Sequence, residues 1–485
     1  MTYSPLSFFK PAMALVGLAA LAACGGGGDS ISSAPPEPTR LQDARVFAPV
    51  VEATFDALGG TTVDTDRWTG VLNNAAYRIE VPKTGWNGKL VMWVHGYRGT
   101  GPNLTVDTPI MRRYLLNNGY AWAASSYTKN YYDVRAGVED TNLLANNFST
   151  IASAKGRPLT APSKIFITGV SMGGHIIGAA IDAEAQSTAL NKVKYAGAVP
   201  MCGVLGDTEL FNYFSGYQVA AQQLAGVPIT KFPTTDFETL TPTIQSALWS
   251  SFPTQTNAQG DKLKNIVKTL SGGERPFYNE AWANPGNQGN IFASLGGDGT
   301  IRGILNDNVL DTTGLFYKVD ASSTSITSVD TAFNTAAFKI TPTADANRLR
   351  RDGLRWIPLT SANISIPVVS IHTLGDLFVP FKMEQVYAQR AKALGTDKFL
   401  VQRAIRDVGH CTFTAAEATS AFDDMVKWEA GGPKPAGDDV TTAATVASPT
   451  YGCKFTNNSP SAQDYTSPTA RAGFQAGYPA CPVAN

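Results

Sequence analysis

The sequence predicts an α/β protein whose mostly parallel sheet is flanked by helices and interrupted by one large insertion. From residue 75, short apolar runs alternate with helix-like stretches, which is the pattern of β-α units. The alternation stops after Gly203 and resumes at Ile366. We therefore expect two parts of one sheet on either side of a long, irregular segment.

Apolar runs bounded by polar or glycine-rich stretches place the strands and helices. Strands are expected at residues 77–81, 90–94, 120–125, 164–168, 195–200, 366–371 and 398–404. Helices are expected near residues 138–152, 173–185, 383–394 and 414–429. The length of 485 residues suits one core with an insertion. We assign the core to residues 41–203 and 361–431, a cap to residues 204–360 and an irregular tail to residues 432–485.

The N-terminal segment has the features of a bacterial export signal. Lys10 precedes thirteen mostly apolar residues, too few for a membrane span of about 20 residues but enough for a signal peptide core. Leu21-Ala22-Ala23-Cys24 resembles the lipobox of bacterial lipoproteins. We expect a signal peptide at residues 1–23, a lipid on Cys24 and a flexible linker at residues 24–40, which places the protein in the outer membrane or periplasm. The alternative is ordinary signal cleavage, which releases a soluble protein.

Charge and short motifs limit the binding partners. Lys and Arg total 39, and Asp and Glu total 39, so no basic face for nucleic acid is indicated. Gly297-Asp298-Gly299 does not open a β-α-β unit and predicts no nucleotide site. Asn306-Asp307-Asn308 with Asp311 lacks the spacing of an EF-hand calcium loop, so we expect a polar loop. No cofactor and no metal are expected, and the expected partner is a small or oligomeric uncharged molecule.

Ser171 lies in the motif Gly169-Val170-Ser171-Met172-Gly173, between a predicted strand and a predicted helix. A serine at such a tight turn has a strained backbone, and glycines on both sides avoid a steric clash. The turn would expose the hydroxyl at the carboxyl edge of the sheet, where ligands of α/β sheets bind. We therefore predict a nucleophile at Ser171, with an inert serine in a glycine-rich loop as the alternative.

A serine nucleophile needs a base and a group that orients the base. His410 is the one histidine of four that follows the last predicted strand; His95, His175 and His372 occur earlier. Asp376 lies between Ser171 and His410 in the chain and follows the strand at 366–371. We predict His410 as the base and Asp376 as the acid, with Asp207 as the second candidate for the acid.

Acyl transfer also requires two backbone N–H groups that bind the oxyanion. Met172, the residue after the nucleophile, is expected to supply one of them. The loop His95-Gly96-Tyr97 after the second strand is expected to supply the other from Tyr97, while His95 supports the loop.

These motifs together resemble the α/β-hydrolase superfamily over about residues 75–203 and 360–430. Tyr97 after a glycine, the serine motif and Gly375-Asp376 are similar to bacterial cutinases and polyester hydrolases. The large cap, and Cys411 directly after the histidine, are similar to the tannase and feruloyl esterase family. That family also has a cysteine directly before its serine, where this chain has Val170. The resemblance implies a serine esterase that forms an acyl-enzyme.

Four cysteines remain besides Cys24, and four allow three disulfide pairings. Cys202 ends the strand after the nucleophile helix and Cys411 adjoins His410, so both are expected at one edge of the sheet. We predict the disulfides Cys202–Cys411 and Cys453–Cys481.

The cap bears on the substrate, because residues 204–360 leave and rejoin the sheet at its carboxyl edge. Its aromatic residues are expected mostly to form its own core, with some lining an apolar cleft. They are Phe211, Tyr213, Phe214, Tyr217, Trp249, Phe252, Phe277, Tyr278, Trp282, Phe316, Tyr317 and Trp356. We expect neutral esters with small to medium or aromatic acyl groups, including polyester oligomers. The alternatives are a serine peptidase of the prolyl oligopeptidase type and a binding lipoprotein without activity.

Overall fold

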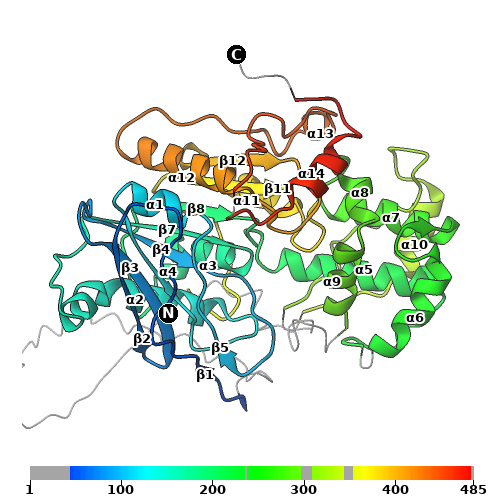
Figure 1. Ribbon diagram of the computed structural model, residues 1–485. Coiled ribbons are helices and arrows are strands. Elements are labelled where there is room, and N and C mark those ends of the chain that lie inside the picture. The colour runs from blue at the N-terminus through cyan, green and yellow to red at the C-terminus, as the bar shows by residue number, and fades with distance from the viewer. Residues whose placement is uncertain (1–43, 235–236, 297–308, 343–352, 462, 482–485) are drawn as a thin grey trace, which may run out of the picture. The chain divides into compact units, whose positions relative to one another are not determined.

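The computed structural model describes residues 44–234, 237–296, 309–342, 353–461 and 463–481 (Figure 1). The predicted signal peptide, the linker and Cys24 lie outside these residues, and so do Gly297-Asp298-Gly299 and Asn306-Asp307-Asn308. Within the described ranges, no helix is both long enough and apolar enough to cross a membrane.

An eight-stranded sheet has the strand order β12-β11-β8-β7-β4-β6-β3-β2 (Figure 1). Its strands are β2 (Thr65–Leu72), β3 (Ala75–Pro82), β4 (Lys89–Val94), β6 (Ala121–Ser125), β7 (Lys164–Val170), β8 (Gly197–Met201), β11 (Val368–Thr373) and β12 (Leu400–Ile405). β3 pairs antiparallel with both β2 and β6. The pairs from β6 through β12 are all parallel, which confirms the mostly parallel sheet predicted from the sequence.

The sequence pattern does not predict β2, the strand at one edge of the sheet. This strand mixes charged and apolar residues because it is only partly buried. A tight turn joins it to β3 through Asn73 and Asn74, which have positive φ angles of 49° and 62°. Consecutive residues with this backbone favour two-residue hairpins. The hairpin therefore depends on turn geometry more than on hydrophobic pattern.

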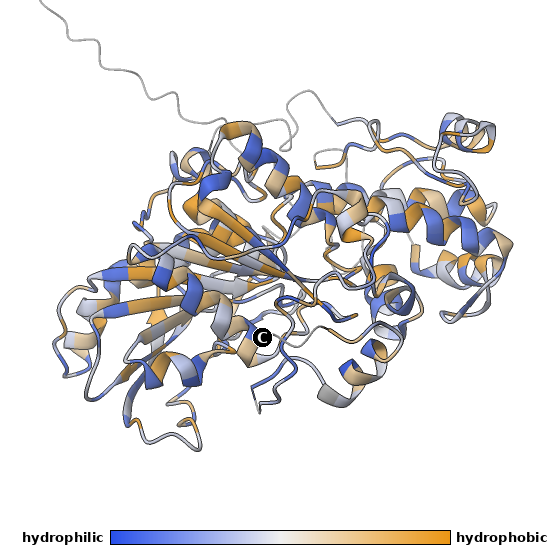
Figure 2. Cartoon of the chain, turned by 90° about the horizontal axis from the view of Figure 1, so that it is seen from above, coloured by the Kyte–Doolittle hydropathy of each residue, from blue (hydrophilic) through white to orange (hydrophobic). Residues whose placement is uncertain are grey.

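Helices cover both faces of the sheet, because successive strand residues point to opposite sides. In β4, Leu90 and Met92 contribute to one core, and Val91 and Trp93 contribute to the other. The first face carries α2 (Val134–Ala154), α3 (Met172–Ile181) and α11 (Lys382–Leu394), and the second carries α1 (Arg112–Asn117) and α12 (Ala415–Glu429). Figure 2 shows hydrophobic strand segments between helices whose residues are of both kinds. Short elements also occur at β1 (Ala48–Pro49), β5 (Asn103–Leu104), α4 (Ala183–Gln186) and a 3-10 turn (Asp397–Phe399).

The cap segment, residues 204–360, is largely helical where the structure describes it, so the expectation of an irregular stretch is wrong. Its elements are α5 (Glu209–Leu224), α6 (Phe237–Leu248), β9 (Trp249–Ser251), β10 (Gln255–Thr256), α7 (Ala258–Leu270), α8 (Tyr278–Trp282), α9 (Pro285–Ser294) and α10 (Ser328–Ala336). In α5, every residue from 210 to 222 is buried. A helix that is buried on all sides shows no amphipathic period, which explains why the pattern concealed it.

Asp207 holds the two ends of the cap segment together. Thr360 donates its backbone N–H to Asp207 Oδ2 at 2.9 Å and its hydroxyl to Leu205 O at 2.6 Å. Arg390 of α11 forms an ion pair with the same carboxylate, which is fully buried. The start and the end of the cap segment are thus fixed to each other and to the core.

The C-terminal segment contains α13 (Ala443–Val446) and α14 (Pro468–Gln475), although its composition predicts an irregular tail. Arg471 of α14 is buried and forms ion pairs with Asp407 and Glu417 of the core. The predicted disulfide Cys453–Cys481 is confirmed, with its Cα atoms 5.1 Å apart. The tail is therefore attached to the core by ion pairs and is cross-linked within itself.

Candidate active site

Ser171 occupies a strained turn between β7 and α3, with φ 59° and ψ −124°. A Cβ atom at Gly169 would lie 2.1 Å from Val94 O, and one at Gly173 would lie 2.2 Å from the same oxygen. Both positions therefore require glycine. Strain of this kind in a non-glycine residue is typical of functional sites and of nucleophile turns.

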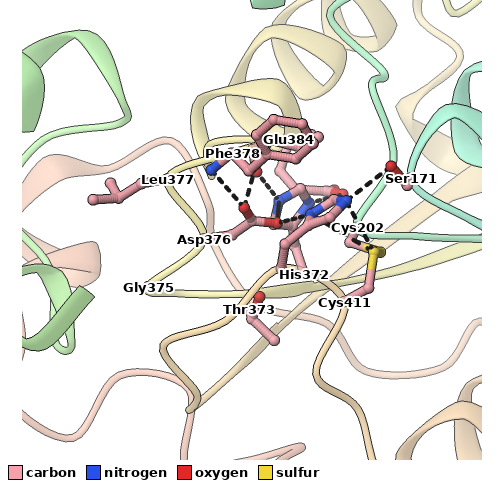
Figure 3. A network of polar contacts seen from close by, with 12 residues as sticks. Ser171, Cys202, His372, Thr373, Gly375, Asp376, Leu377, Phe378, Glu384 and Cys411 are labelled. Atoms are coloured by element: carbon pink, nitrogen blue, oxygen red, sulfur yellow. Dashed lines mark hydrogen bonds and ion pairs between the residues drawn. A yellow bond between two sulfur atoms is a disulfide. The ribbon is translucent and has the colours of Figure 1, made fainter. Parts of the chain in front are cut away.

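Three side chains from three strand ends form a continuous hydrogen-bonded chain (Figure 3). The Ser171 hydroxyl donates to His410 Nε2 at 2.8 Å, and His410 Nδ1–H donates to Asp376 Oδ2 at 2.6 Å. These residues follow β7, β12 and β11, whose carboxyl ends meet at one edge because the strands are parallel. The structure thus brings together the serine, base and acid that the sequence predicts.

This is the geometry of a serine nucleophile with its base and orienting acid. The chain has the α/β-hydrolase fold. This assignment is based on the strand order of the sheet and on the turn at Ser171.

Comparisons with known proteins give partial likenesses. No protein-family model matches the chain. Over 62 residues the chain is 31% identical to an o-phthalyl amidase of Xanthobacter agilis. The matched segment is 13% of this chain and 14% of the amidase. Among solved structures it is similar to feruloyl esterase B of Aspergillus oryzae, with a TM-score of 0.42, 14% identity, and 80% of this chain and 86% of that chain covered. An acylaminoacyl peptidase of Pyrococcus horikoshii gives a TM-score of 0.39 at 10% identity. That match covers 79% of this chain but only 44% of the length of the peptidase.

The carboxylate of Asp376 is fully buried and held in one orientation by its own loop. Its Oδ1 accepts the backbone N–H groups of Phe378 at 2.9 Å and Val379 at 2.8 Å. Its Oδ2 is thereby directed at His410. The Phe378 ring meets the His410 ring edge to face, with 5.3 Å between the ring centres. The loop therefore fixes both the Asp376 carboxylate and one side of the His410 ring.

Asp207, the second candidate for the acid, does not take this role. Its carboxylate is occupied by Arg390 and Thr360, at the junction of the cap segment with the core. The acid that contacts His410 is Asp376.

Three polar side chains of the cap segment bind backbone carbonyl groups around the acid and the base. The hydrogen bonds run from Arg275 Nε to Leu374 O at 2.6 Å, from Tyr213 OH to Leu377 O at 2.9 Å, and from Asn287 Nδ2 to Val408 O at 2.9 Å. Sequence reasoning missed all three, because a side chain that bonds a distant carbonyl leaves no local pattern. The cap segment thus supports the two loops that hold Asp376 and His410.

The predicted oxyanion loop lies directly against Ser171. A Cβ atom at Gly96 would come within 2.9 Å of the Ser171 Cβ, so glycine allows this approach. Tyr97 follows in the same loop. Met172 begins α3, and the first N–H groups of a helix have no acceptor within it. Both predicted donors therefore belong to segments beside Ser171.

His95 supports this loop as expected. Its Nδ1–H donates to Gly96 O at 2.7 Å, and its ring stacks on Tyr127 with 4.1 Å between ring centres. Burial lowers the pKa of His95 to about 4, so the ring is neutral near pH 7. A neutral, buried ring suits a structural role.

The predicted disulfide Cys202–Cys411 is confirmed, with its Cα atoms 5.3 Å apart. Met201 pairs with Val170 in the β7–β8 register, so Cys202 lies one residue beyond the partner of Val170. The Cys411 sulfur is 3.3 Å from His410 Nε2. Cys202, His410 and Cys411 are close enough together to suggest a metal site. Both sulfurs are engaged in the disulfide and offer no thiolate, so the group does not fit a metal ion.

Because this disulfide fixes the loop of His410, its loss is expected to lower kcat. The variant Cys202→Ser/Cys411→Ser should lose roughly tenfold in kcat at a temperature well below its Tm, since small displacements of a catalytic group are costly. The matched control is Cys453→Ser/Cys481→Ser, whose sulfurs contact Arg406 instead. It should lower Tm and retain kcat. Equal kcat values in both variants would contradict a positioning role for Cys202–Cys411.

Proposed function

We propose that the protein is a serine hydrolase that cleaves carboxylic esters through an acyl-enzyme. The observation that carries the proposal is the unbroken contact from Ser171 through His410 to Asp376. Three aligned groups of this kind activate a hydroxyl that is otherwise a poor nucleophile near neutral pH. Retention of all three also argues against a binding protein that has lost activity.

In the first half-reaction, Ser171 Oγ attacks the ester carbonyl carbon while His410 Nε2 takes the hydroxyl proton. Asp376 stabilises the resulting imidazolium, and the N–H groups of Met172 and Tyr97 receive the oxyanion. The C–O bond to the alcohol then breaks, and His410 returns the proton to the leaving oxygen. A water molecule repeats the sequence on the acyl-enzyme, which releases the carboxylic acid and restores Ser171.

The proposed substrates are neutral esters with small to medium or aromatic acyl groups, including polyester oligomers. Most cap aromatics are buried, so they expose little surface to a substrate. Phe378 and Tyr97 are better placed, since both are only partly buried. Phe378 contacts the His410 ring, and Tyr97 follows Gly96, which lies against Ser171. Apolar walls with few charges favour uncharged substrates.

Export and lipid anchoring through Cys24 are part of the proposal. Two disulfides fit an oxidising compartment, which supports export. The lipobox-like sequence before Cys24 supports the anchor.

A substrate panel tests the proposed activity. We expect kcat/KM on p-nitrophenyl esters to be highest for short and aromatic acyl groups and to fall by about C12. The reason is that only a few apolar side chains near Ser171 are available to contact the acyl group. Matched anilides should react at least about 100-fold more slowly. A kcat/KM that rises steadily with acyl chain length beyond about C12 would indicate a lipase. Faster cleavage of anilides or peptides than of matched esters would favour an amidase or peptidase and contradict the proposal.

A further inference from the structure

A second histidine and a glutamate lie close to the proposed acid Asp376 (Figure 3). His372 is in β11 and Glu384 is in the first turn of α11. The His372 side chain is fully buried and the Glu384 side chain is 1% exposed. His372 Nε2 lies 3.7 Å from Asp376 Oδ2, and its Nδ1 lies 3.3 Å from Glu384 Oε1. The mechanism above uses neither residue.

The hydrogen bonds around the pair determine where the protons are. Nε2 of His372 is 2.8 Å from Val379 O, which can only accept, so Nε2 carries a proton. Glu384 Oε2 accepts from the Ser370 hydroxyl and from Gln402 Nε2, which suits an ionised carboxylate. Its Oε1 then accepts a hydrogen bond from Nδ1–H of His372. The ring is therefore an imidazolium paired with a carboxylate.

The local charges agree with this distribution of protons. Burial disfavours the charged ring, but the hydrogen bond to Glu384 and the charges of Glu384 and Asp376 raise the pKa of His372 above its ordinary value. Arg275 approaches Asp376 from the cap segment as a further positive charge. Burial raises the pKa of Tyr213, near Asp376, and of Tyr387 and Tyr451, near Glu384, so these groups are neutral.

We propose that His372 and Glu384 form a positioning ion pair that offsets the charge of the buried Asp376 and keeps its carboxylate directed at His410. A fully buried carboxylate is disfavoured unless positive charge or hydrogen-bond donors compensate it. The imidazolium supplies that charge near Asp376 Oδ2, the oxygen that also accepts from His410, and Glu384 balances the imidazolium in turn. The inference rests on the proposed function, because it assigns His372 and Glu384 a role in that mechanism.

The test compares His372→Gln, Glu384→Gln and the double variant through the pH dependence of kcat/KM on an ester. The acid limb of this profile reports the pKa of the essential base in the free enzyme, here His410. Loss of the imidazolium leaves more negative charge near His410, which favours its protonated form. The acid limb is expected to move to higher pH by about half a unit or more. At the optimum, kcat should fall about tenfold while KM changes less than about threefold.

Glu384→Gln is expected to act in the same direction, because a buried His372 without its counter-ion loses its proton. The double variant should resemble either single variant, since the two residues act as one unit. An acid limb that stays in place, or moves to lower pH, in His372→Gln would overturn the proposal.

His175 provides the matched control. It is also a fully buried histidine whose ring nitrogens contact the Tyr132 hydroxyl and Pro358 O. His175→Gln is expected to lower Tm and to leave the acid limb in place. An equal shift of the acid limb in this variant would show that general destabilisation moves the profile, and would overturn the assignment to His372.

A second readout does not depend on activity. With only four histidines in the chain, ¹⁵N-histidine NMR of the whole protein can resolve each ring. At about pH 7.5, His372 should have both ring nitrogens protonated, unlike an ordinary histidine. A neutral His372 ring would overturn the ion pair. A charged ring in a protein that hydrolyses no ester would instead overturn the proposed function and leave the pair intact.

Discussion

Replacing Ser171 by alanine should abolish ester hydrolysis while the protein remains folded. The hydroxyl oxygen is the atom that bonds to the acyl carbon. No other atom in the hydrogen-bonded series of Ser171, His410 and Asp376 can replace it. Removal of a serine nucleophile typically costs more than about ten-thousand-fold in kcat. The backbone bond from Ser171 N to Met201 O does not involve the side chain, so Tm should change little.

Steady-state kinetics with a thermal melt of each protein measure this effect. Ser215→Ala is a matched control, because Ser215 is a buried serine of the cap segment whose hydroxyl bonds to Phe211 O at 2.9 Å. It should retain activity within about twofold, as expected for a residue outside the mechanism. Activity of Ser171→Ala above about a hundredth of the parent would mean that the nucleophile is misassigned.

Asp376→Asn should have the second largest effect, with a loss of about ten-thousand-fold in kcat. The neutral amide can donate to His410 Nδ1, which would move the ring proton to Nε2. The ring could then no longer accept the proton of Ser171. The geometry of the loop should persist, because the amide oxygen can still accept the N–H groups of Phe378 and Val379.

Asp207→Asn is the informative comparison, because Asp207 is also a buried aspartate that follows a strand of the sheet. Its carboxylate binds Arg390 and Thr360, so its loss should weaken the junction of the cap segment. We expect a destabilisation of roughly 2 kcal/mol, reduced by the partial exposure of Arg390, and kcat within about threefold at low temperature. If Asp207→Asn loses more activity in the folded state than Asp376→Asn, the assignment of the acid is wrong.

The sequence predicted the features that strand ends determine. Ser171, Asp376 and His410 each follow a parallel strand, so chain order and strand position were enough to bring them to one edge. The same reasoning paired Cys202 with Cys411. Gly169 and Gly173 were recognisable because a side chain at either would clash with Val94 O.

Other features could not be predicted because they depend on contacts across the chain. Tyr213, Arg275 and Asn287 bond to carbonyl groups about 100 or more residues away. The role proposed for His372 depends on Glu384, which lies on the neighbouring helix. The helices of the cap segment escaped notice where burial on all sides removed the amphipathic period, as in α5.

Mass spectrometry can detect whether Ser171 becomes covalently acylated. The purified protein is treated with a fluorophosphonate, which mimics the tetrahedral intermediate, and the modified peptide is then sequenced. We expect one adduct, on Ser171, that is absent from Ser171→Ala and forms much more slowly in His410→Ala. An adduct on another residue, or equal labelling of Ser171→Ala, would contradict this expectation.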